Sequence, residues 1–269
     1  MKKTALLTAV ILWFFAPLAA AQPASKPNII IDNLVANYYL DKNSGGVSVL
    51  SAEEDFTVSF PLSGATFSGF VRTIPTSYLK NSNDLKIISV TDATGSNIPY
   101  KTSYDKDKNL MLNVGDPDIK VYGNQTYSIR YQAKGVINTL KDHQEFYPNF
   151  NGRGWDVSFN GISATIHLSN SLAESLKNQP VCYIDSGNCQ IQSIKKATET
   201  QIQVKALNTL QAHQSLTAKL SFKTGTFTAY KQGGLGSVLK KVGLLTVIIV
   251  GLLALLAGTR RLFKIIWHR

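Results

Sequence analysis

The sequence has few of the residues from which most catalytic and metal sites are built. Its 269 residues include four histidines and two cysteines, and the histidines lack the spacing of metal ligands. It contains no H-E-x-x-H, no G-x-S-x-G and no glycine-rich phosphate-binding loop. We therefore expect no metal, no cofactor and no catalytic residue. An enzyme whose site is assembled from residues far apart in the chain stays open as an alternative, because a motif search does not find such a site.

Two acidic stretches also fall short of a site. In DKDKNLMLNVGD, Leu110 stands where a calcium loop requires glycine, and Asp116 replaces the bidentate glutamate. We predict a polar turn at residues 105–109 instead. The three adjacent acids at residues 53–55 lie in a strand-like run, where neighbours point to opposite faces, and we predict that they are surface charge.

Acidic residues are missing from both ends of the chain. All 17 lie between Asp32 and Glu199, and eight of the 28 basic residues lie in residues 1–21 and 239–269. The formal net charge of +11 therefore reduces to 20 basic against 17 acidic residues in between. An excess confined to apolar ends is typical of membrane-flanking charge, so we expect no nucleic acid among the partners.

The N-terminal stretch MKKTALLTAVILWFFAPLAAAQPA has the pattern of an export signal. Two lysines precede an apolar stretch, and three alanines stand before Gln22. The apolar stretch is shorter than the ~20 residues of a membrane-spanning helix. This favours a signal peptide over residues 1–21, with an uncleaved anchor as the alternative.

A second apolar stretch, VGLLTVIIVGLLALLAG, carries no charge and lies between two lysines and two arginines. Its length predicts a transmembrane helix over residues 239–259, and the absence of a polar face distinguishes it from a core helix. More positive charge follows it than precedes it, which predicts a cytoplasmic tail at residues 260–269. The chain is then a single-pass type I protein of the cell membrane. It would have an exported domain over residues 22–224 and a flexible tether over residues 225–238.

Both cysteines lie in the exported part, in VCYIDSGNCQI. The residues DSG at 185–187 predict the turn of a hairpin, across which Cys182 and Cys189 would form a disulfide. Export favours this, because disulfides persist outside the cytoplasm. Two thiols without nearby histidines make no zinc site.

Between residues 29 and 222 the chain reads as one strand after another. Runs of alternating polar and β-branched or aromatic residues are separated by Gly, Asn, Asp and Pro. We predict an antiparallel β-sandwich, and a closed barrel stays open because its spacing is the same. A composition shift near residues 136–142 leaves two subdomains as an alternative. A capping box at Ser171 and Glu174 predicts one short helix that ends before Pro180.

The stretch HQEFYPNFNGRGWDVSF, residues 143–159, has two interpretations. It is either an exposed aromatic platform for a sugar or peptide, with arginine as donor and glycines that let a ligand approach, or a buried corner of the β domain. The alternation from Trp155 to Phe159 favours the buried corner. The residues of the candidate binding loop are Phe146, Tyr147, Phe150, Arg153 and Trp155.

Several fragments together resemble a known family: SVLSAEEDFTVSFP, FSGFVRTIP, GNQTYSIRYQAKGVI and HQEFYPNFNGRGWDVSFNGISATIHL. The chain is similar to an uncharacterised family of predicted bacterial membrane proteins, domain of unknown function 2207, in its N-terminal extracytoplasmic part. The likeness covers residues 28–168 and is faint beyond them. It is carried by Gly69, Arg72, Ile74, Pro75, Tyr127, Ile129, Tyr131, Glu145, Tyr147, Gly154 and Trp155.

The resemblance implies an extracytoplasmic β domain on a membrane anchor and no known enzymatic function. Where the family tends to place a tryptophan after the tyrosine, this chain has Pro148. Relatives usually continue into further membrane and cytoplasmic segments, whereas ten residues follow Thr259 here. We therefore expect no activity that such segments would house.

We expect a non-catalytic, membrane-anchored envelope protein whose exported β domain contacts other proteins or has a structural role at the cell surface. The expected partners are the lipid bilayer and either another envelope protein or a cell-wall glycan. One alternative is a glycan or cell-wall binding module that uses the loop around Trp155. A second alternative is an envelope hydrolase with a dispersed site.

Overall fold

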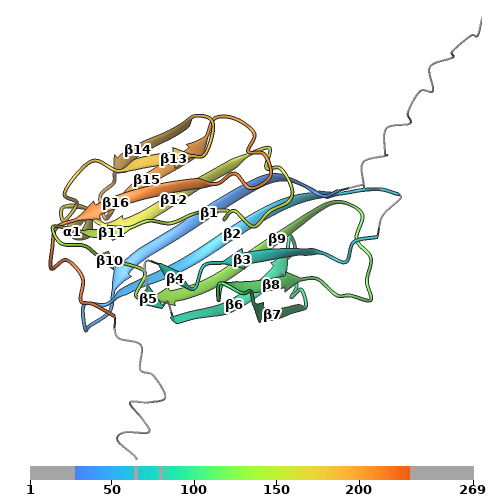
Figure 1. Cartoon of the computed structure of the whole chain (residues 1–269), viewed down its shortest axis with the longest axis horizontal. Coiled ribbons are helices and arrows are strands. Elements are labelled where there is room, and N and C mark those ends of the chain that lie inside the picture. Colours follow the sequence, from blue (N-terminus) through green and yellow to red (C-terminus); the bar gives the residue numbers. More distant parts are fainter. Residues whose placement is uncertain (1–27, 64–65, 79–80, 83, 231–269) are drawn as a thin grey trace, which may run out of the picture.

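The computed structural model describes residues 28–230 except 64–65, 79–80 and 83 (Figure 1). The predicted signal peptide, transmembrane helix and cytoplasmic tail lie outside these residues, as does most of the predicted tether. The described part consists mainly of strands and has one short helix, so the prediction of a mainly β protein is confirmed. Within it, no helix is long and apolar enough to cross a membrane.

Seven strands of the described residues form the largest sheet, and their order in space does not follow the chain. From one edge to the other they are β14 (Cys189–Lys195), β15 (Glu199–Ala206), β12 (Ile162–Ser169), β1 (Ile30–Lys42), β2 (Ser48–Phe60), β9 (Gly123–Lys134) and β6 (Asp84–Asp92).

The other described strands form smaller sheets. A four-stranded sheet has the order β10 (Asn138–Thr139), β11 (Gln144–Phe146), β16 (Leu216–Phe222) and β13 (Val181–Ile184). A three-stranded sheet has the order β3 (Phe70–Ile74), β8 (Leu110–Val114) and β7 (Tyr100–Tyr104), and β4 (Ser77–Tyr78) pairs with β5 (Asn81–Ser82).

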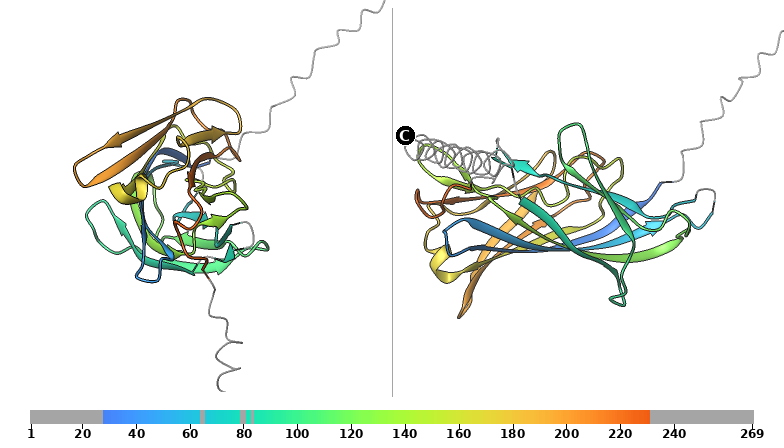
Figure 2. Two further views of the ribbon diagram at one scale, coloured as in Figure 1. Left: turned by 90° about the vertical axis from the view of Figure 1, so that its left-hand side faces the viewer. Right: turned by 90° about the horizontal axis from the view of Figure 1, so that it is seen from below.

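The large sheet buries one of its faces. Along β2, every second residue from Ser48 to Phe60 is buried and the residues between are partly exposed, which is the alternation of a sheet covered on one side. The smaller sheets lie against that side (Figures 1 and 2). The ring of Phe70 on β3 lies 5.3 Å from that of Phe56 on β2 and 5.1 Å from that of Tyr127 on β9. One cluster of buried apolar residues fills the space between the layers.

The large sheet is mixed, which corrects the prediction of a wholly antiparallel sandwich. β1 and β12 run parallel, in register from Leu34 opposite Ile162 to Leu40 opposite Leu168, and the other pairs are antiparallel. Half-buried strands of either direction show the same alternation, so the sequence pattern does not encode direction. Because β1 and β12 join residues on both sides of 136–142 in one sheet, the chain does not divide into two subdomains there.

The segment that contains the cysteines is not a hairpin, which corrects a second prediction. β13 pairs with β16 and β14 pairs with β15, so the chain crosses from the four-stranded sheet to the large sheet between them. Cys182 and Cys189 form a disulfide at this crossing, with their Cα atoms 6.2 Å apart. The bond therefore joins edge strands of two sheets.

Two element ends also differ from the predictions. The helix α1 (Asn170–Ala173) is a single turn, and the hydroxyl of Ser169, not of Ser171, accepts its capping bond from the Leu172 N–H. The β domain continues past residue 224, because Phe227 is buried against Phe222. Residues 225–230 therefore belong to the domain rather than to the tether.

Two hydrogen bonds from one side chain hold residues 225–230 against the domain. The amide of Gln144 on β11 donates to the Phe227 carbonyl at 2.8 Å and accepts from the Phe227 N–H at 2.7 Å. A single aromatic anchor of this kind leaves no periodicity in the sequence, which is why the segment resembled a linker.

Candidate binding pocket

The structure divides the five residues of the candidate binding loop between the core and the surface. Phe146, Phe150 and Trp155 are buried, with at most 6% of each residue exposed. Arg153 is exposed and forms an ion pair with Asp185. Tyr147 is half-buried and lines a pocket. The five side chains therefore do not gather on one exposed platform.

Trp155 occupies a corner of the core. Its ring stacks on Phe70 with centroids 5.8 Å apart and meets Phe159 edge-on at 5.1 Å. Its indole N–H donates to the Asn151 carbonyl at 2.6 Å, so the one polar atom of the ring is satisfied inside the core. This placement agrees with the buried-corner interpretation of the stretch.

A fully buried ion pair lies next to this corner. Glu54 on β2 and Arg72 on β3 have no exposed surface, and the Arg72 Nε lies 2.7 Å from the Glu54 Oε2. Burial opposes the charge of Arg72, but the Glu54 carboxylate outweighs it and raises the pKa of the guanidinium above its usual range. The position of Glu54 corrects the prediction that all three acids of residues 53–55 are surface charge.

Arg72 binds the aromatic stretch to the large sheet. Its guanidinium donates to both carboxylate oxygens of Glu54 and also to the backbone carbonyls of Thr73, Phe150 and Asn151, at 2.7 to 2.9 Å. A guanidinium has five N–H donors, and these contacts use all of them. Residues 150–151 are therefore held at a fixed position above β2.

Two tyrosines complete the network around Glu54. The hydroxyls of Tyr38 on β1 and Tyr131 on β9 donate to the Glu54 Oε1 at 2.7 and 2.8 Å, and their oxygens are 3.0 Å apart. Burial, with the nearby carboxylate, raises the pKa of both hydroxyls well above their usual range. Both tyrosines therefore stay protonated donors to Glu54 at any physiological pH.

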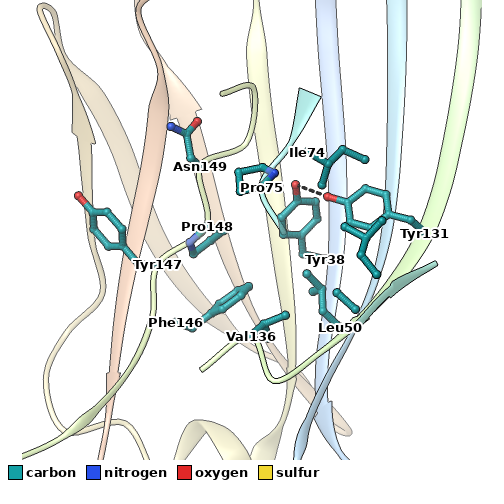
Figure 3. Close-up of a pocket in the computed structure, with 12 residues that line it drawn as sticks. Tyr38, Leu50, Ile74, Pro75, Tyr131, Val136, Phe146, Tyr147, Pro148 and Asn149 are labelled. Carbon is teal, nitrogen blue, oxygen red and sulfur yellow. Dashed lines mark hydrogen bonds between the residues drawn. The ribbon is translucent and has the colours of Figure 1, made fainter. Parts of the chain in front are cut away.

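The same two tyrosines form one wall of a pocket of about 280 Å³ (Figure 3). In the close-up, Tyr38 and Tyr131 lie across the recess from the segment from Phe146 to Asn149. Pro75 lies between the two sides, and Ile74 lies next to the tyrosines. The lining residues are Tyr38, Leu50, Ile74, Pro75, Leu85, Tyr131, Ala133, Val136, Phe146, Tyr147, Pro148 and Asn149. They carry no carboxylate, imidazole, thiol or amine. Apart from apolar groups, their side chains include three tyrosine hydroxyls and one amide.

The pocket lies close to the point where the described chain ends. Tyr230 packs on Gly135, next to the lining residue Val136, and a Cβ at Gly135 would lie 2.4 Å from the Tyr230 ring. The Tyr230 hydroxyl also interacts with Asp84, which adjoins the lining residue Leu85. The domain therefore places the pocket beside its C-terminal exit.

The acidic stretches form no metal site in the described residues. No group of three or more His, Cys, Asp or Glu side chains in that part of the chain could hold a metal ion. The Asp105 carboxylate accepts from the N–H groups of Asp107 and Asn109 at 2.9 and 2.8 Å, so the predicted polar turn is confirmed.

Comparison with known families gives a clear result. The family described as predicted membrane protein (DUF2207) N-terminal domain matches residues 31–229. The chain belongs to this family. The match extends well past residue 168, where the likeness in sequence became faint, and it includes β16 and Phe227. The family match thus includes residues 225–229, which pack as part of the β domain.

Other comparisons are more distant. None of the curated proteins compared matches the chain. The M1 zinc metallopeptidase from Deinococcus radiodurans is 8% identical with a TM-score of 0.44, over 71% of this chain and 42% of that one. Leukotriene A4 hydrolase from Saccharomyces cerevisiae is 11% identical with a TM-score of 0.43, over 77% and 32%. The chain thus spans less than half the length of these structures, and likeness at this level says nothing about a site or an activity.

Proposed function

We propose that the DUF2207 domain is a non-catalytic binding module that receives an apolar group of another envelope protein in the pocket beside Tyr38 and Tyr131. The observation that supports this most is the pocket itself. It is an open apolar recess whose walls are tied together by the Glu54 and Arg72 network. Because the recess is already formed, few of its side chains have to become ordered when a ligand binds, and little conformational entropy is lost.

The chemistry of the lining favours binding over catalysis. Glu54 and Arg72 lie behind the tyrosines, but their donors and acceptors are used on each other, on the two hydroxyls and on backbone carbonyls. A general acid or base must lie within hydrogen-bond reach of its substrate, and neither Glu54 nor Arg72 is among the residues that line the pocket. Burial of one large apolar side chain in the recess would contribute about 1.5–3 kcal/mol.

The proposal includes the topology that the sequence predicts: a signal peptide, an exported domain, a single type I transmembrane helix and a cytoplasmic tail. The pocket lies beside Tyr230, and residues 231–238 can span at most about 28 Å when fully extended. On this topology the pocket stays near the outer surface of the membrane. The partner is then a protein that is itself anchored in that membrane or bound to it.

The glycan alternative receives less support. A sugar platform needs exposed aromatic faces, whereas Phe146, Phe150 and Trp155 are buried. Arg153, the proposed donor of that platform, is engaged with Asp185. Of the five candidate residues, Phe146 and Tyr147 line the pocket, and none of the buried rings offers an exposed face to a sugar.

The proposal is tested by site-specific photocrosslinking in living cells. A photoreactive phenylalanine analogue replaces Tyr147 at the pocket, and in a matched control it replaces Tyr104, which is 68% exposed on β7. We expect a discrete crosslinked species from position 147 and none from position 104. Ala133→Leu, which places three more carbon atoms in the recess, should remove the species from position 147.

Three results would contradict the proposal. They are an absence of crosslinks at position 147, the same species from both positions, and a species that survives Ala133→Leu in a folded protein. Protein levels and the disulfide, followed on non-reducing gels, show whether each variant is folded.

A further inference from the structure

We propose that the partner enters as an extended polypeptide segment, which adds a strand beside Asn149 and inserts one apolar side chain into the pocket. This inference deepens the proposed function and rests on it. It specifies the occupant as backbone plus side chain, rather than an isolated apolar group such as a lipid chain.

The backbone at Asn149 carries the first part of the inference. The Pro148 carbonyl accepts from the Ala218 N–H at 3.1 Å, and the Phe150 N–H donates to the Leu216 carbonyl at 2.9 Å. Asn149 and Thr217 therefore lie opposite each other as a non-hydrogen-bonded pair of antiparallel strands. In an antiparallel pair this pattern turns the N–H and C=O of the middle residue away from the partner strand. Neither group of Asn149 bonds to another described residue.

β10 does not extend along that side as far as Asn149. β10 covers β11 only where Asn138 faces Glu145 and Thr139 faces Gln144. Beyond Phe146 the line of β10 holds no paired strand among the described residues, and Val136 belongs to the lining of the pocket instead. An incoming strand would lie beside Asn149, in line with β10. One of its residues would donate its N–H to the Asn149 carbonyl and accept from the Asn149 N–H, as an antiparallel partner does.

The recess carries the second part. Its volume of about 280 Å³ lies just below the ~300–1,000 Å³ of sites that take a whole small molecule. It suits one large side chain, and it adjoins the free edge because Pro148 and Asn149 line it. Strand addition commonly combines main-chain bonds with a pocket for one side chain. The pocket lies beside Tyr230, close to the predicted transmembrane helix. The occupant that fits is therefore a segment of a neighbouring protein that lies next to the membrane.

The test uses the full chain in lipid nanodiscs and four fluorescent pentapeptides, Thr-Val-X-Val-Thr, with X as Phe, Leu, Trp or Tyr. Binding is followed by fluorescence polarisation. For the tightest peptide, each residue is then N-methylated in turn. A lost backbone hydrogen bond weakens binding about tenfold, so we expect N-methylation to weaken binding at one residue only, the one whose N–H donates to the Asn149 carbonyl. X→Asp and Ala133→Leu should each abolish binding, whereas Thr102→Leu on the exposed strand β7 should leave it unchanged.

Two results would overturn the inference: no peptide binds more tightly than its X→Asp form, or N-methylation has the same effect at every residue. If such a result accompanies a specific crosslink from position 147, only strand addition fails and the proposed function stands. If the crosslink is also absent, both fail.

Discussion

Arg72 links the parts of the molecule that form the pocket. It is the largest fully buried side chain of the described residues, and it joins the carboxylate on β2 to the carbonyls of Phe150 and Asn151. A buried ion pair does not by itself indicate stability, because the loss of solvation offsets the attraction. Here the guanidinium also donates to three backbone carbonyls, those of Thr73, Phe150 and Asn151, and so contributes hydrogen bonds beyond the ion pair.

Arg72→Met should therefore be severely destabilising. It leaves Glu54 buried without its counter-charge, for which we expect a loss of about 3–5 kcal/mol in the free energy of unfolding. Urea denaturation of the full chain in detergent measures it. The matched control is Arg130→Met, which removes the exposed pair of Arg130 with Glu53 and should cost at most about 1 kcal/mol. Equal losses in the two variants would show that the buried network does not hold the domain together.

No motif marks the residues of this network, but their position in the alternating pattern of each strand could have identified them in the sequence. Glu54 alternates in step with the buried Ala52 and Phe56, and Arg72 in step with Phe70 and Ile74. A charged residue in the apolar phase of a strand is a sign of a buried pair. The composition of residues 53–55 concealed this, because three adjacent acids resemble ordinary surface charge.

At the scale of elements, alternation predicted the strands well and their partners poorly. Turn residues between β13 and β14 predicted a hairpin, yet each strand pairs in a different sheet. Local turn chemistry determines where a chain reverses, but long-range packing decides which strand lies beside it. The parallel pair of β1 and β12 escaped prediction for the same reason, since its partners are more than 100 residues apart.

The disulfide should matter most at the edges that it joins. Replacing both cysteines, Cys182→Ser with Cys189→Ser, frees a loop with a sequence separation of seven and should cost about 2 kcal/mol of stability. Hydrogen exchange should rise in β13 and β14 and stay unchanged in β2 and β9, which are paired on both sides. Faster exchange throughout the large sheet would contradict the view that the bond acts locally.

At the scale of the whole molecule, the pocket depends on parts of the chain that no local pattern connects. Its walls come from β1, β2, β3, β6, β9, β11 and the segment after β11. The resemblance to the DUF2207 family rested partly on Ile74, Pro75, Tyr131 and Tyr147, and these four lie together in the lining. The sequence thus contained members of the site, but only the fold brings them to one place beside the chain exit.

The most direct measurement compares the reactivity of two introduced cysteines towards a membrane-impermeant maleimide. Asn149→Cys lies at the pocket, and Thr102→Cys lies on the exposed strand β7. On intact spheroplasts we expect Thr102→Cys to react and Asn149→Cys to be protected at least tenfold, with the protection lost after purification in detergent. Equal reactivity of the two cysteines in the membrane would contradict the claim that a partner occupies the pocket.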